Sequence, residues 1–220
     1  MSHFATARQK MVDGQVRPSD VTDLRIIEAM LAVPREMFVP QDKRPIAYLD
    51  REIEVGGAAA KRYLIQPVVL AKMLQAADIS AADRVLVVGC ATGYAAAVAA
   101  HLSDSVFATE PDAALAAQAA ANLAELGLAR VTVRAAGVEA GDPVHAPYDV
   151  IVLDGATERD PQGLYDQLKL GGRLVGVFAQ SRPPRAMLVT RSAADMGSRV
   201  LFDASAPVLP GLERRPAFVF

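Results

Sequence analysis

The stretch that decides the fold combines a buried strand, a tight turn and the start of a helix: Val85-Leu86-Val87-Val88-Gly89-Cys90-Ala91-Thr92-Gly93-Tyr94. The apolar run ends at Gly89, and a helical pattern begins after Gly93. Ligands of open parallel sheets bind outside the carboxyl ends of the strands, where the strand order reverses. Glycine lets the backbone approach a ligand closely, and a helix start offers unpaired N–H groups. The stretch therefore predicts a ligand-binding turn after the first strand of such a sheet.

From residue 66 onward, helical and strand patterns alternate along the chain. The periodicity predicts helices over 67–77, 94–102, 112–126 and 161–168, and strands over 84–88, 105–109, 131–134, 148–153 and 173–178. Strands that alternate with helices and are apolar on both faces indicate a parallel sheet covered on both sides. Segments 186–191 and 200–204, joined by a polar turn containing Gly197, predict an antiparallel hairpin at the sheet edge. We therefore predict an α/β, Rossmann-like fold of the methyltransferase type, mostly parallel with a C-terminal antiparallel hairpin.

The first sixty residues differ in character from the rest. Helices are expected over 8–15 and 20–32, and Pro34 ends the second of them. An irregular, charged stretch follows as far as Glu54. We predict an N-terminal helical cap, residues 1–60, packed on a core of residues 61–220, with both parts in one structural domain.

Composition narrows the class of protein. Of 220 residues, 52% are hydrophobic and 22% are charged, and the net charge is −2, so neither nucleic acid nor an anionic membrane is the expected partner. The single cysteine, Cys90, cannot form an intramolecular disulfide, and the Cys/His spacing of a zinc site is missing, so no metal is expected. The chain shows neither a signal-peptide pattern nor an apolar run long enough to span a bilayer. We expect a cytoplasmic protein.

An acidic residue lies in step with the glycine turn. Glu110 follows Gly89 by twenty-one residues, at the end of the second predicted strand. An acid there can accept hydrogen bonds from the two ribose hydroxyls of an adenosine-type cofactor. Gly89 and Gly93 are four residues apart, and the G-x-G-x-x-G of dinucleotide binders is missing, which favours S-adenosyl-L-methionine (SAM) over NAD. The candidate cofactor-binding residues are Gly89, Cys90, Ala91, Thr92, Gly93, Glu110, Pro111, Gly137, Val138 and Asp154.

Several motifs between about Gln9 and Leu212 resemble the protein-L-isoaspartate (D-aspartate) O-methyltransferase family. The most specific is the V-P-R-E-M-F-V-P run of residues 33–40. Gln66-Pro67 resembles the family's entry into its first core helix, and residues 89–94 resemble its cofactor loop. Gly171-Gly172-Arg173-Leu174 resembles its fifth-strand entry, although many methyltransferases share that turn. The chain is similar to a divergent member of this family.

The resemblance implies a fold, the cofactor SAM and a substrate class. That class is the free carboxylate of an isoaspartyl residue in a damaged protein or peptide, so the expected role is protein repair. A carboxylate is already ionised at neutral pH, so it can attack the sulfonium methyl without a general base. The enzyme then has to hold nucleophile and methyl group in line and to exclude water.

One departure concerns the substrate. Where the family has a hydroxyl-bearing Thr-Ile-Ser run before the Gln-Pro, this chain has Tyr63-Leu64-Ile65 after a longer loop. An isoleucine side chain cannot hydrogen-bond a carboxylate. Arg62 and Tyr63 are therefore candidate catalytic residues that, with Lys61, could supply a substitute anion contact. The alternative is that Lys61 and Arg62 are solvated charges on an exposed loop.

Other departures concern the cofactor. Ala91 replaces the middle glycine of the loop, and Val87 stands where an acid commonly precedes it. Gly137-Val138 occupies the place of the family's aspartate that contacts the adenine amino group, and Glu139 could compensate. Loss of one charge-assisted hydrogen bond, about 1–2 kcal/mol, would weaken cofactor binding by about tenfold or more.

Asp154 leaves two further functions open. It ends the fourth predicted strand, where many methyltransferases face the transferred methyl group, so it is a candidate catalytic residue. It could act as a general base or metal ligand for a hydroxyl-bearing substrate of a different SAM-dependent methyltransferase, although Asp154-Gly155 is also a good turn. The third possibility is a catalytically silent relative that binds a partner or a modified protein without turnover.

Overall fold

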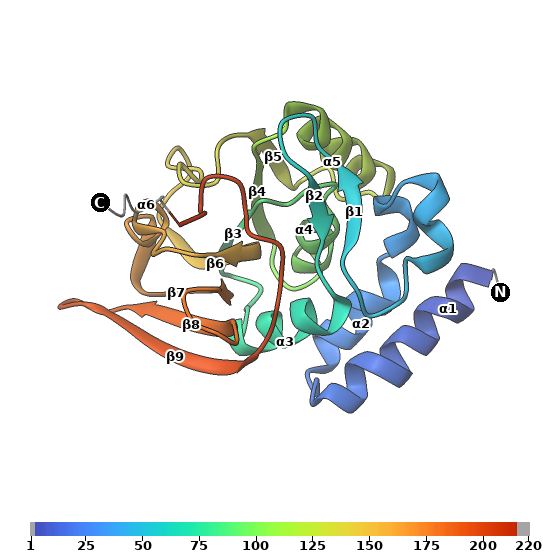
Figure 1. Cartoon of the computed structure of the whole chain (residues 1–220), viewed down its shortest axis with the longest axis horizontal. Coiled ribbons are helices and arrows are strands. Elements are labelled where there is room, and N and C mark those ends of the chain that lie inside the picture. The colour runs from blue at the N-terminus through green and yellow to red at the C-terminus, as the bar shows by residue number, and fades with distance from the viewer. Residues whose placement is uncertain (1–2, 215–220) are drawn as a thin grey trace, which may run out of the picture.

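The computed structural model describes residues 3–214, and within them a seven-stranded sheet has the order β5-β4-β3-β6-β7-β8-β9 (Figure 1). Neighbouring strands from β5 to β7 pair in parallel, whereas β8 and β9 are antiparallel additions. The strands are β3 Arg84–Val88, β4 Ser105–Glu110, β5 Thr132–Ala135, β6 Tyr148–Thr157, β7 Leu168–Phe178, β8 Arg185–Arg191 and β9 Met196–Asp203. The predicted fold class is confirmed.

The two faces of the sheet are covered unequally. The helices are α1 His3–Met11, α2 Leu24–Ala32, α3 Pro67–Ala77, α4 Tyr94–Ala99, α5 Ala113–Glu125 and α6 Gln162–Tyr165. Val85 and Val87 of β3 belong to the larger core cluster, together with buried residues of α2, α3, α4 and α5. Leu86 and Val88 belong to the second cluster, with residues of α6 and the C-terminal segment. Side chains alternate between the faces of a strand, so this division follows from the period of two.

The N-terminal helices differ from their expected bounds. Helix α1 begins at His3 and continues as a π-helix over Val12–Val16 and a 3₁₀ turn over Arg17–Ser19. Helix α2 begins at Leu24 rather than near residue 20, because the Asp23 side chain caps it by accepting a 2.9 Å hydrogen bond from the Arg25 amide. Asp/Asn side chains at this position satisfy helix donors that have no other partner. The charged stretch that follows contains 3₁₀ helices over Arg35–Phe38 and Gln41–Ile46.

A hairpin lies where the sequence indicated only irregular chain. Strands β1 Ile53–Gly56 and β2 Arg62–Leu64 pair antiparallel and form a separate two-stranded sheet. Gly56 and Gly57 have φ values of 111° and 115°, which favour glycine at the turn. At the hairpin tip, the Ala58 amide donates a 2.6 Å hydrogen bond to Asp112, the N-cap of α5.

Strands β6 and β7 are longer than predicted. Asp154 and Gly155 lie inside β6, so the interpretation of this pair as a turn is wrong. Gly171-Gly172, which precede the strand predicted over 173–178, lie inside β7, where the positive φ of Gly171 accommodates a bulge between the β6 and β7 registers. Gly197 likewise lies within β9, opposite Thr190, instead of in the turn before it.

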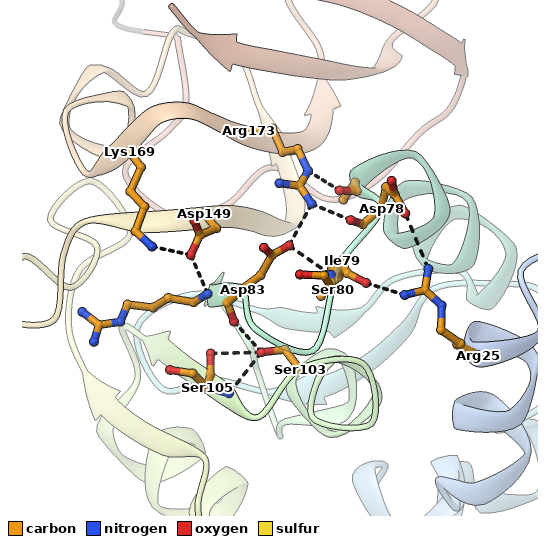
Figure 2. A network of polar contacts seen from close by, with 12 residues as sticks. Arg25, Asp78, Ile79, Ser80, Asp83, Ser103, Ser105, Asp149, Lys169 and Arg173 are labelled. Carbon is orange, nitrogen blue, oxygen red and sulfur yellow. Dashed lines mark hydrogen bonds and ion pairs between the residues drawn. The ribbon is translucent and has the colours of Figure 1, made fainter.

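A polar network ties the amino ends of the central strands to α3 (Figure 2). The Arg173 guanidinium donates to the carbonyl oxygens of Ala77 and Asp78 and lies 2.9 Å from Asp83 Oδ2. Lys169 Nζ lies 2.7 Å from Asp149 Oδ2, which also accepts from the Arg84 amide. This network lies at the amino ends of the strands, at the opposite end of the sheet from the glycine turn.

Candidate cofactor site

The turn after β3 is held against β4 by backbone hydrogen bonds. The amides of Gly89 and Cys90 both donate to the Thr109 carbonyl, at 2.8 and 2.9 Å. The φ values of Gly89, Ala91 and Gly93 are 73°, 50° and 101°. Ala91 thus carries a side chain in the left-handed region that glycine tolerates best. In the strand order, β3 and β6 are adjacent at the reversal point, so the turn lies where ligands of open α/β sheets bind.

Glu110 lies beside this turn with both carboxylate oxygens engaged. Its Oε2 accepts a 2.7 Å hydrogen bond from the Ala91 amide. Arg62 Nε donates to Oε1 at 2.9 Å, and Arg62 Nη2 lies 3.2 Å from Oε2. Arg62 Nη2 also donates to the Gly89 carbonyl at 2.8 Å. The side chains are 2% and 0% exposed for Arg62 and Glu110, so this ion pair is shielded from water.

The strand alternation of β2 explains why Arg62 reaches Glu110. Arg62 and Leu64 are buried, whereas Tyr63 between them is half-buried and points to the other face. Lys61 precedes the strand, its side chain is 70% exposed, and its Nζ lies 3.1 Å from Glu54. The interpretation of both cations as solvated loop charges is therefore wrong for Arg62. The expected catalytic roles of Arg62 and Tyr63 stay predictions.

The C-terminal segment covers the turn from the second side. After β9 the chain runs back across the carboxyl ends of β3 and β6, where Val208 forms a bridge with Ala156 (Figure 1). The Leu209 amide donates to the Ala156 carbonyl at 2.8 Å. A Cβ atom built on Gly89 or Gly155 would lie 2.6 or 2.7 Å from the Leu209 side chain. A side chain at either position would have to displace Leu209, and at Gly155 it would also lie 3.0 Å from the Pro207 carbonyl oxygen.

The space left beside Arg62 and Glu110 is too small for the ribose and base of an adenosine-type cofactor. A cavity of ≈ 60 Å³ is lined by Ala59, Ala60, Arg62, Pro111, Asp112 and Pro210. Small-molecule sites typically enclose roughly 300–1,000 Å³. The side chains present therefore do not fit SAM in this conformation. Arg62 binds both carboxylate oxygens of Glu110, and Leu209 covers Gly89.

Asp154 lies under the same turn and is 3% exposed. Burial raises the pKa of Asp154 to about 7, against the opposing influence of Arg62 and Arg35. Its Oδ2 has no hydrogen-bond partner among the described residues. Cys90 is also buried, and burial raises the pKa of its thiol. A carboxyl group with this pKa can exchange a proton near neutral pH, which is what the predicted general-base role requires.

The remaining predicted cofactor residues lie around the same sheet edge. The Thr92 hydroxyl donates to the Phe38 carbonyl at 2.5 Å and thereby ties the turn to the N-terminal segment. Gly137 and Val138 follow β5, and Val138 is buried in the second core cluster. Glu139 forms an ion pair with Arg159, and more than half of the Glu139 side chain is exposed. Whether Glu139 compensates for the missing aspartate stays a prediction, as do the other cofactor contacts.

Sequence reasoning missed the buried Arg35. Its Nε donates to the Ala47 carbonyl at 2.9 Å and its Nη2 to the Ile65 carbonyl at 2.7 Å. The guanidinium also lies 4.5 Å from the centre of the Tyr94 ring, a cation–π distance. Arg35 thus joins the V-P-R-E segment, the loop before α3 and the first residue of α4. The V-P-R-E run was the available signal, whereas nothing in the apolar run around Leu209 indicated its place.

Residues 3–214 contain neither a candidate metal centre nor a candidate membrane-spanning helix. That part of the chain contains no cluster of His, Cys, Asp or Glu side chains arranged to hold a metal ion. None of the helices in that range combines the length and the apolar character that a bilayer crossing demands.

Comparison with known sequences gives consistent matches. The sequence profile described as protein-L-isoaspartate (D-aspartate) O-methyltransferase matches residues 6–201. A protein-L-isoaspartate O-methyltransferase from Rhodopseudomonas palustris (strain ATCC BAA-98 / CGA009) is 38% identical over 205 residues, 92% of this chain and 93% of the relative. A relative of the same name from Gloeobacter violaceus is 40% identical over 83% of this chain and 88% of its own length.

Solved structures agree with these matches at the level of the fold. A protein-L-isoaspartate O-methyltransferase superposes with a TM-score of 0.83 at 24% identity, covering 94% of this chain and 67% of that one. A Plasmodium falciparum structure described by the same activity, in complex with S-adenosyl-L-homocysteine, has a TM-score of 0.76 at 16% identity. It covers 95% of this chain and 99% of its own.

Proposed function

Because the chain belongs to the protein-L-isoaspartate (D-aspartate) O-methyltransferase family, we propose that it transfers a methyl group from SAM to isoaspartyl carboxylates of proteins. The family uses SAM, so the expected enzyme class and cofactor agree with the family assignment. The comparisons favour this function over the alternative methyltransferase based on Asp154 and over the silent relative.

The placement of Glu110 carries the proposal. This buried carboxylate ends β4, and its Oε2 is 2.7 Å from the Ala91 amide in the turn after β3. The arrangement supports recognition of a ribose, since a carboxylate at this point can accept hydrogen bonds from both hydroxyls. Arg62 now takes those acceptor positions, so cofactor binding depends on its displacement.

The proposed substrate asks little of acid–base groups. An isoaspartyl carboxylate is ionised at neutral pH and is therefore a nucleophile without a general base. The residues of this chain would have to bind that carboxylate, orient it and exclude water. Ile65 offers no side-chain donor for this purpose, and its carbonyl is already bound by Arg35. The proposed partner is thus a protein or peptide, with a substrate contact different from the Thr-Ile-Ser run.

A second proposal concerns the organisation of the chain. We propose that the helical cap, residues 1–60, and the core, residues 61–220, act as one unit. In support, one cluster of buried residues contains Met30 and Phe38 of the cap together with Leu70 and Val85 of the core.

A methyl-transfer assay tests the proposed function. The chain is incubated with SAM labelled on its methyl group and with one of two peptides that differ only in an isoaspartyl or an aspartyl linkage. Base-labile methyl ester should form on the isoaspartyl peptide and be at least tenfold lower on the aspartyl control, a difference on the order of 1.4 kcal/mol. Equal labelling, or none while SAM binds, would refute the isoaspartyl assignment.

A further inference from the structure

The hairpin β1–β2 places Arg62 on the carboxylate that a cofactor ribose would use. We infer that this chain occludes its own cofactor site, and that ligand binding requires the hairpin to withdraw Arg62 from Glu110. The inference rests on the proposed function, because it concerns the regulation of the same site. It assigns to Arg62 the role of an internal competitor instead of a substrate contact.

The hydrogen bonds of Glu110 show the competition directly. Arg62 contacts both carboxylate oxygens, at 2.9 and 3.2 Å, and the Ala91 amide takes a further position on Oε2. Bidentate arginine–carboxylate pairs are stronger than hydrogen bonds from neutral hydroxyls. Two ribose hydroxyls would therefore replace a stronger partner of Glu110. The Arg62 guanidinium would lose its counter-charge and would have to move to another environment.

Arg62 also fills the space next to the turn. Its Nη2 donates to the Gly89 carbonyl at 2.8 Å and lies 2.9 Å from the point where a Cβ atom of Gly89 would stand. The cavity of ≈ 60 Å³ at Pro111 and Asp112 adjoins the Arg62 side chain. Withdrawal of Arg62 would extend this cavity toward the Glu110 carboxylate and the Gly89 carbonyl.

The base of the hairpin is attached to the core through the buried side chains of Ile53, Val55 and Leu64, whereas its tip is exposed. The hairpin forms its own two-stranded sheet, and such hairpins are marginally stable by themselves. Ala58, Ala59 and Ala60 at its tip are exposed, and the Ala58 amide is bound to Asp112. The polar links between hairpin and core are those of Arg62 with Glu110 and the Gly89 carbonyl and that of the Ala58 amide with Asp112. Their rupture would free the tip, while the buried apolar side chains hold the base of the hairpin in place.

Calorimetric titration with S-adenosyl-L-homocysteine tests the inference on three full-length proteins. These are the wild type, Arg62→Met, and the control Arg185→Met, which removes an arginine paired with Asp203 on the hairpin β8–β9. Arg62→Met should bind the ligand at least about tenfold more tightly than the wild type, because the competent state no longer has to displace Arg62. Arg185→Met should bind as the wild type does. Equal or weaker binding by Arg62→Met would overturn the inference, and so would the absence of binding to all three.

A second variant guards against misfolding of Arg62→Met. Arg62→Lys keeps the positive charge but cannot form the bidentate pair, so it should also bind more tightly than the wild type. If the circular dichroism spectrum shows that Arg62→Met is unfolded, Arg62→Lys alone decides the outcome. Ligand binding by Arg62→Lys with the affinity of the wild type would then contradict occlusion. Hydrogen exchange of amides 56–64 adds a readout at ligand saturation, where exchange should become faster, and slower exchange contradicts release of the hairpin.

The outcomes separate this inference from the proposed function. Tighter ligand binding by Arg62→Met, with no isoaspartyl methylation by any variant, supports occlusion and refutes the isoaspartyl assignment. Isoaspartyl methylation by the wild type, with the same ligand affinity in Arg62→Met, supports the assignment and overturns occlusion.

Discussion

Arg62 Nε lies 2.9 Å from Glu110 Oε1, although 48 residues separate them along the chain. One residue belongs to a small hairpin and the other ends the second strand of the main sheet. Both side chains are buried, so each charge depends on the other for compensation. This pair connects the stability of the fold with access to the candidate cofactor site.

Substitution of Glu110 should expose this dependence. Glu110→Gln leaves the Arg62 cation buried without a counter-charge, so the free energy of unfolding should fall by about 3 kcal/mol. The double variant Glu110→Gln with Arg62→Met should be more stable than Glu110→Gln alone, because it removes the uncompensated charge. Urea denaturation of the wild type, the two single variants and the double variant gives the coupling free energy between Arg62 and Glu110. A loss below about 1 kcal/mol in Glu110→Gln would indicate that the buried pair is not formed in solution.

The pKa of Asp154 predicts a specific pH dependence. Burial raises the pKa of Asp154 to about 7, well above that of an unfolded aspartate. The native state therefore binds a proton that the unfolded state has released, and the resulting stability is lost as the pH rises through 7. Between pH 5 and pH 8 the wild type should lose roughly 2 kcal/mol more unfolding free energy than Asp154→Asn. Parallel profiles for the two proteins would show that Asp154 is ionised throughout this range.

The positive φ of Ala91 predicts an unusually mild glycine substitution. Ala91→Gly relieves about 1–2 kcal/mol of backbone strain but loses a buried methyl group and increases the freedom of the unfolded chain by similar amounts. Its effect on the free energy of unfolding should stay within about 0.5 kcal/mol. Ala96→Gly, in the interior of α4, has no strain to relieve and should destabilise by about 1–2 kcal/mol. Thermal denaturation compares the two, and equal losses would place Ala91 outside the left-handed region.

A substitution in the Arg173 network, at the amino ends of the strands, should change the free energy of unfolding but not the affinity for ligand. Burial acts to raise the pKa of Asp83, but hydrogen bonds from Ser80 and Arg173 outweigh it and lower the pKa below the usual value. Ionised Asp83 therefore stabilises the fold at neutral pH, and this contribution is lost as the pH falls below about 4. Arg173→Ala should lower the free energy of unfolding by about 1–3 kcal/mol at pH 7, with a smaller loss at pH 3.5. Its affinity for S-adenosyl-L-homocysteine should equal that of the wild type, and a changed affinity would imply coupling across the sheet.

Local pattern determined much of the architecture. The bounds of α3 and β3 agree with prediction, because Pro67 marks a helix start and the apolar run 84–88 is bounded by turn residues. The alternation of helix and strand predicted the parallel sheet and its antiparallel edge. The family followed from the motifs around Val33–Pro40 and Gly89–Tyr94, which are contiguous and carry their information in residue order.

Local pattern failed where distant segments decide the structure. Asp154-Gly155 has the composition of a turn, yet it lies inside β6, in a bulge between the β6–β7 pairs of Val152 and Ala156, where Leu209 covers Gly155. The strands β1 and β2 are too short to produce a recognisable period of two in the sequence.

The sequence by itself determined that a glycine turn follows the first strand of the sheet and that Glu110 ends the second strand beside it. Only the tertiary structure decided which residues contact Glu110 and Gly89: Arg62 comes from a hairpin 48 residues before Glu110, and Leu209 comes from the C-terminal segment. The physical reason is that the partner of a buried charge is chosen by chain folding, through burial and geometry, and leaves no periodic signal along the sequence.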